Sequence, residues 1–537
     1  MTEERETPAS TTSKLAIVIM AAGKGTRLKS RRPKVLHEIG GKSLLSHVIA
    51  AAREIVPPEH IYAVVGHQAD KVKAAVASTG IRFVVQTEQR GTGHAIQAAR
   101  EAIAGFENIL VLSGDAPLIQ PETLSALWHF HQAQQAAMTL TSAEPADPTG
   151  YGRVIHPEQP DPPHRATAVM NALLDQPQKL GAPSFSQPHR EKGGRPQPST
   201  SLVHPQPSSP EVVAIIEQKM LAPEQLPLRE VNMGLYAFRT APLLANLGTL
   251  DTNNPHGELY LTDMAHVLHA AGERVVAFLA PDADQLLGAN TIAEMMALDA
   301  NLRMASARRL MAAGVTIFRP ETCVIDADVE VGPDTVIEPF VQLLGSTRIG
   351  SDCKIRSYTV VENCSVGNDV VLLQSCVMAD STVADGARLG PFTRLRPGCE
   401  IGEEVHMGNF VEAKKAKLHK GAKAGHLAYL GDAEIGEGTN IGAGVITCNY
   451  DGVHKHKTLI GNDAFIGSDS TLVAPVEVGD RAYIGAGSCI TKDVPAGSLA
   501  VARAHQVTKE GWADSRRAHA APNTSPAIDP NNVGFKA

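Results

Sequence analysis

The sequence predicts two folded parts of different kinds, an α/β, Rossmann-like domain followed by a parallel β-helix. Three observations lead to this prediction. Apolar runs alternate with amphipathic segments in the first half of the chain, a six-residue repeat fills much of the second half, and glycine is plentiful while aromatic residues make up only 4% of 537 residues. One hydrophobic core rarely organises a chain of this length, which favours several domains.

The composition excludes some classes of protein. Hydrophobic residues make up 43% of the chain and charged residues 20%, with a formal net charge of −8 at pH 7. Affinity for a phosphate backbone depends on an excess of Lys and Arg, so we expect no nucleic-acid partner. The N-terminal segment is polar and no apolar stretch is long enough to span a bilayer, so we expect no membrane partner. All seven cysteines lie in the second half without a CxxC pair, which favours free thiols and a cytoplasmic location.

Residues 15–288 are predicted to form a mainly parallel sheet with crossover helices. The apolar runs lack the alternation of half-exposed strands, which is typical of strands buried on both faces. These runs are LAIVIM, IYAVVG, FVVQ, ILVLSGD, MTLTS, VVAIIE, VNMGLYAF and VVAFLA. Ligands of such sheets lie beyond the carboxyl ends of strands, so the loops after LAIVIM and ILVLSGD are candidate binding loops.

Four segments lie outside these two folds. Residues 1–14 are predicted to be a disordered extension and residues 509–537 a C-terminal tail. Residues 156–210 are rich in Pro, Ser, Gln and His, too poor in apolar surface to offset the entropy of ordering, and are predicted to be a disordered insertion. A partner-docking polyproline segment is the alternative for that insertion. Residues 289–314 have helical periodicity and end in glycine, which predicts a helical linker.

Residues 315–508 are predicted to form the β-helix. Hexads such as TVIEPF, TRIGSD and AYIGAG repeatedly place an aliphatic residue before a small one. The aliphatic side chain then points inward, the small residue turns the corner, and each coil stacks on the previous one. The period loosens from RLRPGCEIG to KAGHLAYLGD and is interrupted at VITCNYDGVHKHK. Departures from a repeat indicate a requirement other than packing.

The loop MAAGKGTRLKSRRPK is predicted to bind an anion. Six Lys and Arg residues follow a strand and two glycines, Gly23 and Gly25, which would let backbone N–H groups approach a phosphate. The loop is not a Walker A motif and lacks the third glycine of a dinucleotide-binding fingerprint. Taken alone, a tight turn with solvated basic residues explains it nearly as well.

Two more motifs lie at predicted strand ends. Asp115 follows ILVLSG, where a carboxylate can ligate Mg²⁺ beside nucleotide phosphates, although a turn-forming aspartate is the simpler alternative. QTEQRGTGHA offers Gln86 and a Gly91–Thr92 turn into a helix. That turn suits recognition of a nucleobase edge, or it is an ordinary helix N-cap.

Together these motifs resemble those of the bacterial bifunctional N-acetylglucosamine-1-phosphate uridylyltransferase and glucosamine-1-phosphate acetyltransferase, over nearly the whole chain. The matching motifs are MAAGKGTRL, PKVLH, QTEQRGTGHA, GDAPL, PTGYGRV, VNMGLYAF, NPHGELYLTD, GNFVEAKKA, KAGHLAYLGD and NIGAGVITCNYDG. The first is shared by many sugar-nucleotide pyrophosphorylases, whereas KAGHLAYLGD with TCNYDG is specific to the bifunctional enzyme. The resemblance implies a nucleotidyltransferase domain, a left-handed β-helix, a homotrimer with acetyl sites between subunits, and synthesis of UDP-N-acetylglucosamine for cell-wall precursors.

The resemblance implies a uridylyl site in the first domain. N-acetylglucosamine 1-phosphate would attack the α-phosphate of UTP in line and release pyrophosphate, with Arg27 and Lys34 offsetting the developing charge. Asp115 and Asn290 would hold Mg²⁺. The residues implied to bind the nucleotide or the sugar are Met20, Ala21, Ala22, Gly23, Lys34, Gln86, Gly91, Thr92, Ser113, Gly114, Asp115, Gly152, Glu217, Asn232 and Asn290. The Pro-rich insertion separates Gly152 from Glu217, so it either loops out or covers this site as a lid.

The resemblance implies a second site in the β-helix, where acetyl-CoA acetylates glucosamine 1-phosphate. His426 would be the general base, because the 2-amino group must lose a proton and an imidazole titrates near neutral pH. Glu412 would orient that imidazole. The residues implied to bind glucosamine 1-phosphate are Arg396, Lys414, Tyr429 and Asn440. Those implied to contact the sugar or acetyl-CoA are Ala443, Asn449, Tyr450, Ser468, Ala486 and Arg503.

Two other functions stay open at this point. One is a pyrophosphorylase with a single activity, whose β-helix serves only assembly or regulation; His426 beside Asn449 and Tyr450 disfavours it. The other is a non-catalytic scaffold of the same architecture, which the presence of Arg27 and Asp115 disfavours.

Overall fold

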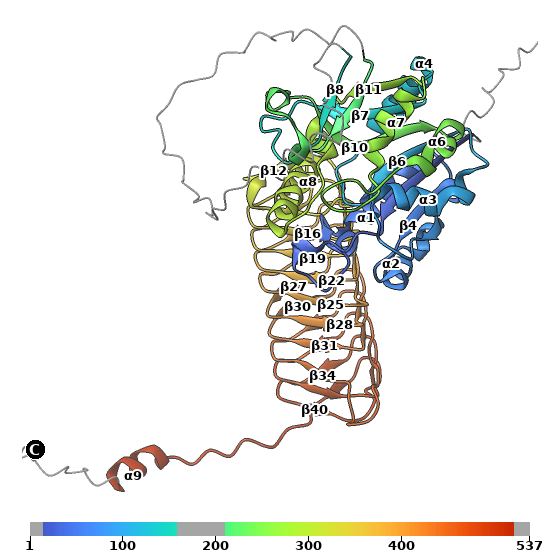
Figure 1. The fold of residues 1–537 in the computed structure, drawn as a ribbon. Coiled ribbons are helices and arrows are strands. Elements are labelled where there is room, and N and C mark those ends of the chain that lie inside the picture. The colour runs from blue at the N-terminus through green and yellow to red at the C-terminus, as the bar shows by residue number, and fades with distance from the viewer. Residues whose placement is uncertain (1–13, 158–209, 520–537) are drawn as a thin grey trace, which may run out of the picture. The chain divides into compact units, whose positions relative to one another are not determined.

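The computed structural model describes residues 14–157 and 210–519 of the chain (Figure 1). The chain forms two compact units. The first runs to Arg309 and also takes in Ile325–Asp328, and the second holds Leu310–Val324 and the residues from Val329 onward. The Pro-rich segment, apart from its edges, and most of both predicted terminal segments lie outside the described residues. No helix within the described ranges has the length and apolar character needed to cross a membrane.

A nine-stranded sheet organises the first unit. Its main path has the order β11-β7-β10-β6-β1-β4-β5. The strands are β1 (Leu15–Ala21), β4 (Ile61–Val65), β5 (Arg82–Val85), β6 (Asn108–Ser113), β7 (Met138–Ala143), β8 (Arg153–Ile155), β9 (Ala214–Ile216), β10 (Val231–Arg239) and β11 (Val275–Leu279). β1 pairs in parallel with β4 and β6, whereas β10 runs antiparallel to β6 and β7. The predicted, mainly parallel sheet is therefore confirmed, with β10 reversed within the main path and β9 reversed beside β8.

Helices connect and cover these strands (Figure 1). They are α1 (Leu44–Arg53), α2 (Ala69–Ala75), α3 (Thr92–Ile103), α4 (Pro121–Gln134), α6 (Thr240–Asn246), α7 (Met264–Ala270) and α8 (Ile292–Ala312). The Ser43 hydroxyl caps α1 by accepting the Ser46 N–H at 3.1 Å, and Pro121 opens α4, a position where a missing N–H costs nothing. α8 is rich in Ala, Leu and Met and stops before Gly314, which has φ +94°.

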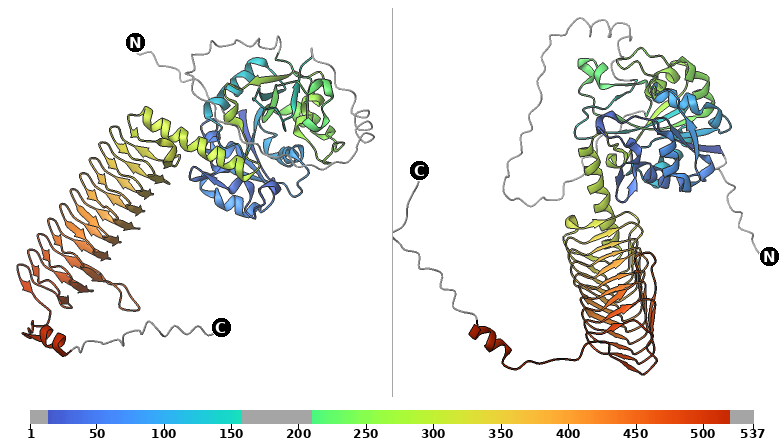
Figure 2. Two further views of the ribbon diagram at one scale, coloured as in Figure 1. Left: turned by 90° about the vertical axis from the view of Figure 1, so that its left-hand side faces the viewer. Right: turned by 90° about the horizontal axis from the view of Figure 1, so that it is seen from below.

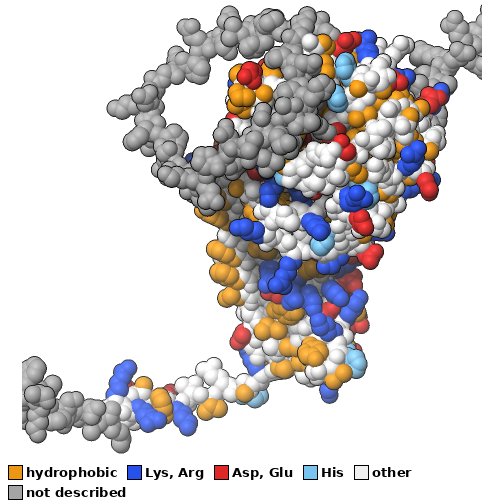
Figure 3. All heavy atoms as spheres, in the orientation of Figure 1, with side chains coloured by type: hydrophobic (Ala, Val, Ile, Leu, Met, Phe, Trp, Pro, Cys, Tyr) orange, Lys and Arg blue, Asp and Glu red, His pale blue; other side chains and the backbone are white. Residues whose placement is uncertain are grey.

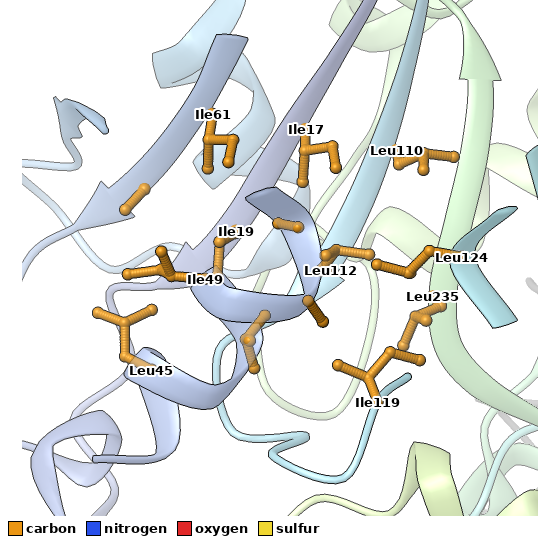
Figure 4. Close-up of a cluster of buried hydrophobic side chains, with 14 of the residues drawn as sticks. Ile17, Ile19, Leu45, Ile49, Ile61, Leu110, Leu112, Ile119, Leu124 and Leu235 are labelled. Atoms are coloured by element: carbon orange, nitrogen blue, oxygen red, sulfur yellow. The ribbon is translucent and has the colours of Figure 1, made fainter. Parts of the chain in front are cut away.

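Both faces of the sheet are buried, which explains the unalternated apolar runs. Successive side chains of β1 enter different cores, with Ile17 and Ile19 in one and Val18 in the other. Figure 4 shows the first core, in which β1 lies between the strands that carry Ile61 and Leu110, and Leu45 and Ile49 of α1 pack on this face of the sheet. Because β1, β4, β5 and β6 all point the same way, their carboxyl ends meet at one edge of the sheet.

The second unit is a β-helix with three parallel sheets (Figure 2). One sheet contains β12 (Thr316–Ile317), β15 (Val336–Ile337), β18 (Lys354–Ile355), β21 (Val371–Leu372), β24 (Arg388–Leu389), β27 (His406–Asn409), β30 (Lys423–His426), β33 (Asn440–Ile441), β36 (Phe465–Ile466), β39 (Tyr483–Ile484) and β41 (Leu499–Ala500). The second contains β13 (Val324–Ile325), β16 (Gln342–Leu344), β19 (Val360–Glu362), β22 (Val377–Ala379), β25 (Arg394–Arg396), β28 (Glu412–Lys414), β31 (Tyr429–Gly431), β34 (Ile446–Cys448), β37 (Thr471–Val473) and β40 (Cys489–Ile490). The third contains β14 (Glu330–Val331), β17 (Arg348–Ile349), β20 (Ser365–Val366), β23 (Thr382–Val383), β26 (Glu400–Ile401), β29 (Lys417–Leu418), β32 (Ala433–Ile435), β35 (Thr458–Ile460) and β38 (Val476–Val478).

The aliphatic residues of the hexads fill the interior of the coils, as the sequence predicts. Ile337 pairs with Ile355 and Ile355 with Leu372, and all three side chains are fully buried. The predicted loop is also present, because Tyr450 and Lys455 form an isolated antiparallel bridge outside the coil. Five of the seven cysteines are buried, and all seven are free thiols. After the last coil the chain continues to a short helix, α9 (Trp512–His519).

Candidate active sites

The loop after β1 contains two glycines with different tasks. No atom lies within 4 Å of a Cβ built on Gly23, so the backbone there faces open space. Gly25 has φ +61°, and a Cβ there would lie 2.7 Å from the Cβ of Lys34. Gly25 therefore makes room for Lys34, whereas the expectation was that both glycines make room for a phosphate.

Five polar side chains meet at the carboxyl edge of the sheet. Lys34 Nζ forms an ion pair with Asp115 Oδ2 and donates a hydrogen bond of 2.9 Å to Asn290 Oδ1. Arg27 Nη2 donates to the same Asn290 oxygen at 2.8 Å. The Ser113 hydroxyl donates to Asp115 Oδ1. The loops after β1 and β6 and the start of α8 thus assemble one cationic and anionic cluster from distant parts of the sequence.

The oxygens of this cluster suit a hard divalent cation. Asp115 Oδ2 and Asn290 Oδ1 both face the Lys34 ammonium, so a carboxylate and an amide oxygen converge on one positive charge. Oxygen ligands of this kind fit Mg²⁺, which protein sites often bind through one or two carboxylates together with phosphates and waters. The described ranges contain no group of three or more His, Cys, Asp or Glu that could hold a metal without such phosphates.

Two cavities adjoin the cluster. The larger, about 790 Å³, includes Arg27, Gly152, Glu217, Asn232 and Asn290 in its lining. The smaller, about 480 Å³, is lined by Met20–Thr26, Lys34, Gln86 and Gly91. Both share a wall that contains Met20, Thr92, Ser113, Asp115 and Glu258. Arg27 lines the larger cavity and Lys34 the smaller, so the cluster lies at the junction of the two.

The turn before α3 is held by close backbone contacts. Gly91 has φ +105°, and a Cβ there would lie 2.5 Å from the Leu259 carbonyl oxygen. Thr92 Oγ1 accepts the Leu261 N–H at 2.9 Å. Gln86 is buried, and its Nε2 donates to the Gly91 carbonyl at 3.2 Å. Gln86 therefore shapes this turn, in addition to lining the smaller cavity where base recognition was expected.

The residues predicted to bind the sugar, Gly152, Glu217 and Asn232, lie close together although the insertion separates them in sequence. β8 pairs antiparallel with β9, so the chain segments that flank the insertion are adjacent strands. A Cβ on Gly152 would lie 3.7 Å from Glu217 Oε1, and the Asn232 N–H donates to the Gly152 carbonyl at 2.9 Å. Burial and the nearby Asp263 raise the pKa of the Glu217 carboxyl.

Two tyrosines of this cavity were missing from the sequence interpretation. Tyr236 OH accepts a 2.9 Å hydrogen bond from Asn232 Nδ2, and Tyr260 lines the same cavity. Burial, with Glu217 as the next contributor, raises the pKa of Tyr260 to about 12. No sequence pattern marks either tyrosine as functional, because each resembles an ordinary aromatic residue of a strand or a turn.

In the β-helix, four predicted residues and Asn409, which the sequence did not single out, occupy one corner of successive coils. We call it the catalytic corner, after the role predicted for His426, and it contains Asn409, His426, Ala443, Ser468 and Ala486. Asn409 and His426 are paired in the ladder of β27 and β30. The Ala443 carbonyl accepts the Asp469 N–H at 2.7 Å and the Ser468 carbonyl the Gly487 N–H at 2.8 Å. Arg503 Nη1 donates to the Ala486 carbonyl at 2.6 Å. His426 is exposed at this corner.

A basic and polar surface lies on the next sheet round the coil. Arg396 and Lys414 are ladder neighbours. Hydrogen bonding to the Lys455 side chain is the main cause that lowers the pKa of the Lys414 ammonium. A Cβ on Gly431 would lie 2.6 Å from Tyr429 OH and 2.8 Å from Asn449 Nδ2, so these two groups converge. Asn440, by contrast, lies on β33 in the same sheet as His426, beside Lys423 of β30.

The loop that carries Tyr450 is fixed by Asp451. Asp451 Oδ1 accepts the N–H groups of Val453 and His454, and Oδ2 bonds His456 Nε2 at 2.8 Å. These bonds, that of the His454 N–H foremost, lower the pKa of Asp451 to about 2. The Tyr450 ring is 59% exposed and available for contact.

Glu412 has a partner other than the one expected. Its Oε1 accepts a 3.2 Å hydrogen bond from Arg396 Nη1, and the two residues lie on neighbouring strands of one sheet. His426 ends a strand of the adjacent sheet. Within the described residues, Glu412 therefore holds Arg396, and the expectation that it orients His426 is replaced by that contact.

Comparison with known proteins assigns both units to transferase classes. Residues 17–181 match the MobA-like NTP transferase domain, and residues 328–363 and 457–492 match the bacterial transferase hexapeptide repeats. Together with the α/β sheet and the stacked coils, these matches define a nucleotidyltransferase joined to a hexapeptide-repeat transferase.

The relatives match over nearly their whole length. Bifunctional protein GlmU of Koribacter versatilis (strain Ellin345) is 54% identical over 508 residues, covering 95% of this chain and 98% of the relative. Those of Solibacter usitatus (strain Ellin6076) and Pelobacter propionicus are 44% and 40% identical, covering 94% and 93% of this chain and 97% and 98% of theirs. The chain belongs to the GlmU family. It is a bifunctional uridylyltransferase and acetyltransferase that makes UDP-N-acetylglucosamine, as its motifs predicted.

Proposed function

We propose that uridylyl transfer takes place at the junction of the two cavities. The single observation that carries this proposal is that Arg27 and Lys34 line different cavities and donate to the same Asn290 oxygen. UTP occupies the cavity of the β1 loop, and N-acetylglucosamine 1-phosphate occupies the cavity of Glu217 and Asn232. A phosphate oxygen of the sugar then attacks the α-phosphorus of UTP, and the bond to pyrophosphate breaks.

In this proposal the protein positions the reactants and neutralises charge. Arg27 and Lys34 stabilise the charge that develops on the α-phosphate and on pyrophosphate. Asp115 and Asn290 hold Mg²⁺, which supplies further neutralisation of phosphate oxygens. Replacing Asp115 by Asn tests this: we expect loss of UTP-dependent pyrophosphate release and weaker Mg²⁺ binding in calorimetry. Unchanged Mg²⁺ affinity would remove Asp115 from the metal site.

We propose that acetyl transfer takes place at the catalytic corner. His426 accepts a proton from the 2-ammonium group of glucosamine 1-phosphate, and the amine nitrogen bonds to the acetyl carbon. The bond to the CoA sulfur then breaks, and the second proton that the nitrogen loses goes to the departing thiolate. Arg396 and Lys414 bind the phosphate of the sugar. The row of Ala443, Ser468, Ala486 and Arg503 suits an extended acetyl-CoA, because all four lie along one corner of consecutive coils. Loss of acetyl transfer in His426→Ala, with sugar binding retained, is the expected result.

We also propose that the chain assembles as a homotrimer through its β-helix. Five exposed hydrophobic residues have left-handed backbone conformations at corners of the β-helix, with Ser375 at the corner between the second and the third: Phe340, Tyr358, Phe392, Phe410 and Leu427. Bulky residues rarely adopt this conformation, and Figure 3 shows exposed hydrophobic side chains on the β-helix surface. Leu427 follows His426, so a partner on this row would border the catalytic corner. Light scattering of wild type against Phe410→Lys checks it, and an unchanged mass would argue against this row as the interface.

The free thiols support a cytoplasmic location, because disulfides form in oxidising compartments and are rare in reducing ones.

For the Pro-rich insertion, the pairing of β8 with β9 supports a loop-out, since Glu217 keeps its place beside Gly152. Deleting residues 160–208 distinguishes the two alternatives. Unchanged kinetics would exclude a lid.

A further inference from the structure

Helix α8 joins the uridylyl site to a second cluster of charges. Asn290 lies just before the helix, and Arg303 follows 13 residues later, about 20 Å along the axis. Arg303 Nε donates to both Asp299 oxygens at 3.1 and 2.9 Å, and its Nη1 donates to Asp326 Oδ1 at 2.6 Å. The Asp326 side chain is only 6% exposed. A guanidinium that donates to two partly buried carboxylates forms a stronger interaction than an ion pair on the surface.

A tight hairpin rests on this cluster. Its strands are β2 (Glu38–Ile39) and β3 (Lys42–Ser43), joined by Gly40 and Gly41. The Gly40 N–H donates to Asp299 Oδ1 at 2.8 Å, and the Gly40 carbonyl accepts the Ala327 N–H at 3.1 Å. Gly41 has φ +82°, and a Cβ there would collide with the Asp326 carboxylate. The hairpin is therefore hydrogen-bonded to Asp299 of α8 and to Ala327 of the segment Ile325–Asp328.

The same hairpin lies next in sequence to the catalytic lysine. Lys34 begins a short 3-10 helix that ends at Leu36, and β2 begins at Glu38. A small apolar core links the hairpin to both ends of the site. It contains Leu28, Ile39, Leu44, Ala289, Met295 and Leu298. Leu28 adjoins Arg27 and Ala289 adjoins Asn290, so this core connects both residues to α8 through Met295 and Leu298.

We propose that Arg303 is a positioning residue for uridylyl transfer, because through Asp299, Asp326 and the Gly40–Gly41 hairpin it holds Lys34 and Asn290 in place. It touches no substrate in this proposal. One consequence is that Ile325–Asp328, although it begins with the last residue of β13, is a structural part of the uridylyl unit. The inference rests on the roles proposed above for Lys34 and Asn290.

The test uses the full-length protein with Arg303→Gln, Arg303→Lys and, as a matched control, Arg308→Gln. Arg308 is an exposed arginine on the same helix. We expect Arg303→Gln to lower the kcat of uridylyl transfer about tenfold, because small misplacements of catalytic groups cost that much or more. Arg303→Lys should recover part of the loss, and Arg308→Gln should match wild type. Acetyl transfer, measured on the same samples, should be unchanged in all three.

A double-mutant cycle separates positioning from general damage. If Arg303 acts through Lys34, adding Arg303→Gln to Lys34→Ala should lower kcat no further. Unchanged kcat in Arg303→Gln, an equal loss in Arg308→Gln, or full additivity with Lys34→Ala would each overturn the inference. If Lys34→Ala alone leaves kcat unchanged, the proposed function of that site fails instead, which is a distinguishable result.

Discussion

The two catalytic regions build their sites in opposite ways. In the α/β unit, Arg27 and Asn290 bond across 263 residues of sequence at one edge of a sheet. In the β-helix, His426, Ala443 and Ser468 stand at one corner of consecutive coils. The first site depends on long-range packing of several elements, whereas the second depends on how each coil stacks on its neighbour. The structural effect of one substitution should therefore spread through the first unit, whereas in the second unit it should stay within neighbouring coils.

The largest expected effect is on the ion-paired lysine. Lys34→Ala should lower the kcat of uridylyl transfer about 10³-fold, because it removes a charge that faces the reacting phosphate and leaves Asp115 without its ion pair. Steady-state kinetics with saturating UTP measure this. Acetyl transfer is the internal control and should be unchanged. A loss of less than threefold would remove Lys34 from the chemistry.

A pH effect should distinguish the two units. Burial, assisted by Arg239, lowers the pKa of His131 to about 4, and His131 bonds the Thr139 hydroxyl at 2.7 Å. Below pH 6.5 the unfolded chain binds a proton that the folded unit does not, so stability is lost as pH falls from 6.5 toward 4, by about 3 kcal/mol in total.

Hydrogen exchange of β7 and α4 at pH 7 and pH 5, corrected for intrinsic rates, measures this loss. His131→Gln should show less pH dependence in that region, and the β-helix strands should keep their protection at both values. Equal protection of β7 at the two pH values in the wild type would contradict the assignment.

The substitution Gly442→Ala tests whether a structural change in one coil of the β-helix stays local. A Cβ on Gly442 would lie 2.5 Å from the Ser468 backbone nitrogen, so Gly442→Ala should strain the catalytic corner by about 2 kcal/mol. Acetyl transfer should fall, while uridylyl transfer should be retained. Loss of both activities would show that strain in one coil reaches the other unit.

The smallest expected effect concerns Glu217. Its raised pKa means that the carboxylate takes up a proton at a higher pH than an ordinary glutamate would. If the carboxylate binds the sugar, kcat/KM for N-acetylglucosamine 1-phosphate should fall about tenfold as pH drops through that raised pKa. Glu217→Gln should show a lower kcat/KM that no longer changes there. A wild-type profile that is flat down to the usual glutamate range would remove the carboxylate from sugar binding.

The sequence predicts the β-helix better than the sheet, for a physical reason. Hexads are local, so Ile337, Ile355 and Leu372 reveal their burial through the period alone. The direction of β10 has no such signal, because a strand buried on both faces looks the same whichever way it runs.

The same distinction holds for the candidate sites. Asp115 was found because it ends an apolar run, whereas Arg303 and Asp326 looked like ordinary helix and hexad residues until the fold brought them together. Glu412 was expected to orient His426. The two residues lie on strands of different sheets, and Glu412 bonds Arg396 on the neighbouring strand of its own sheet.

The most direct test of two independent sites is a pair of separate assays on two variants of the full chain. One assay follows acetyl-CoA-dependent acetylation of glucosamine 1-phosphate, and the other follows UTP-dependent release of pyrophosphate. We expect His426→Ala to abolish only the first and Asp115→Ala only the second. Loss of both activities in either variant, or retention of both, would contradict the account.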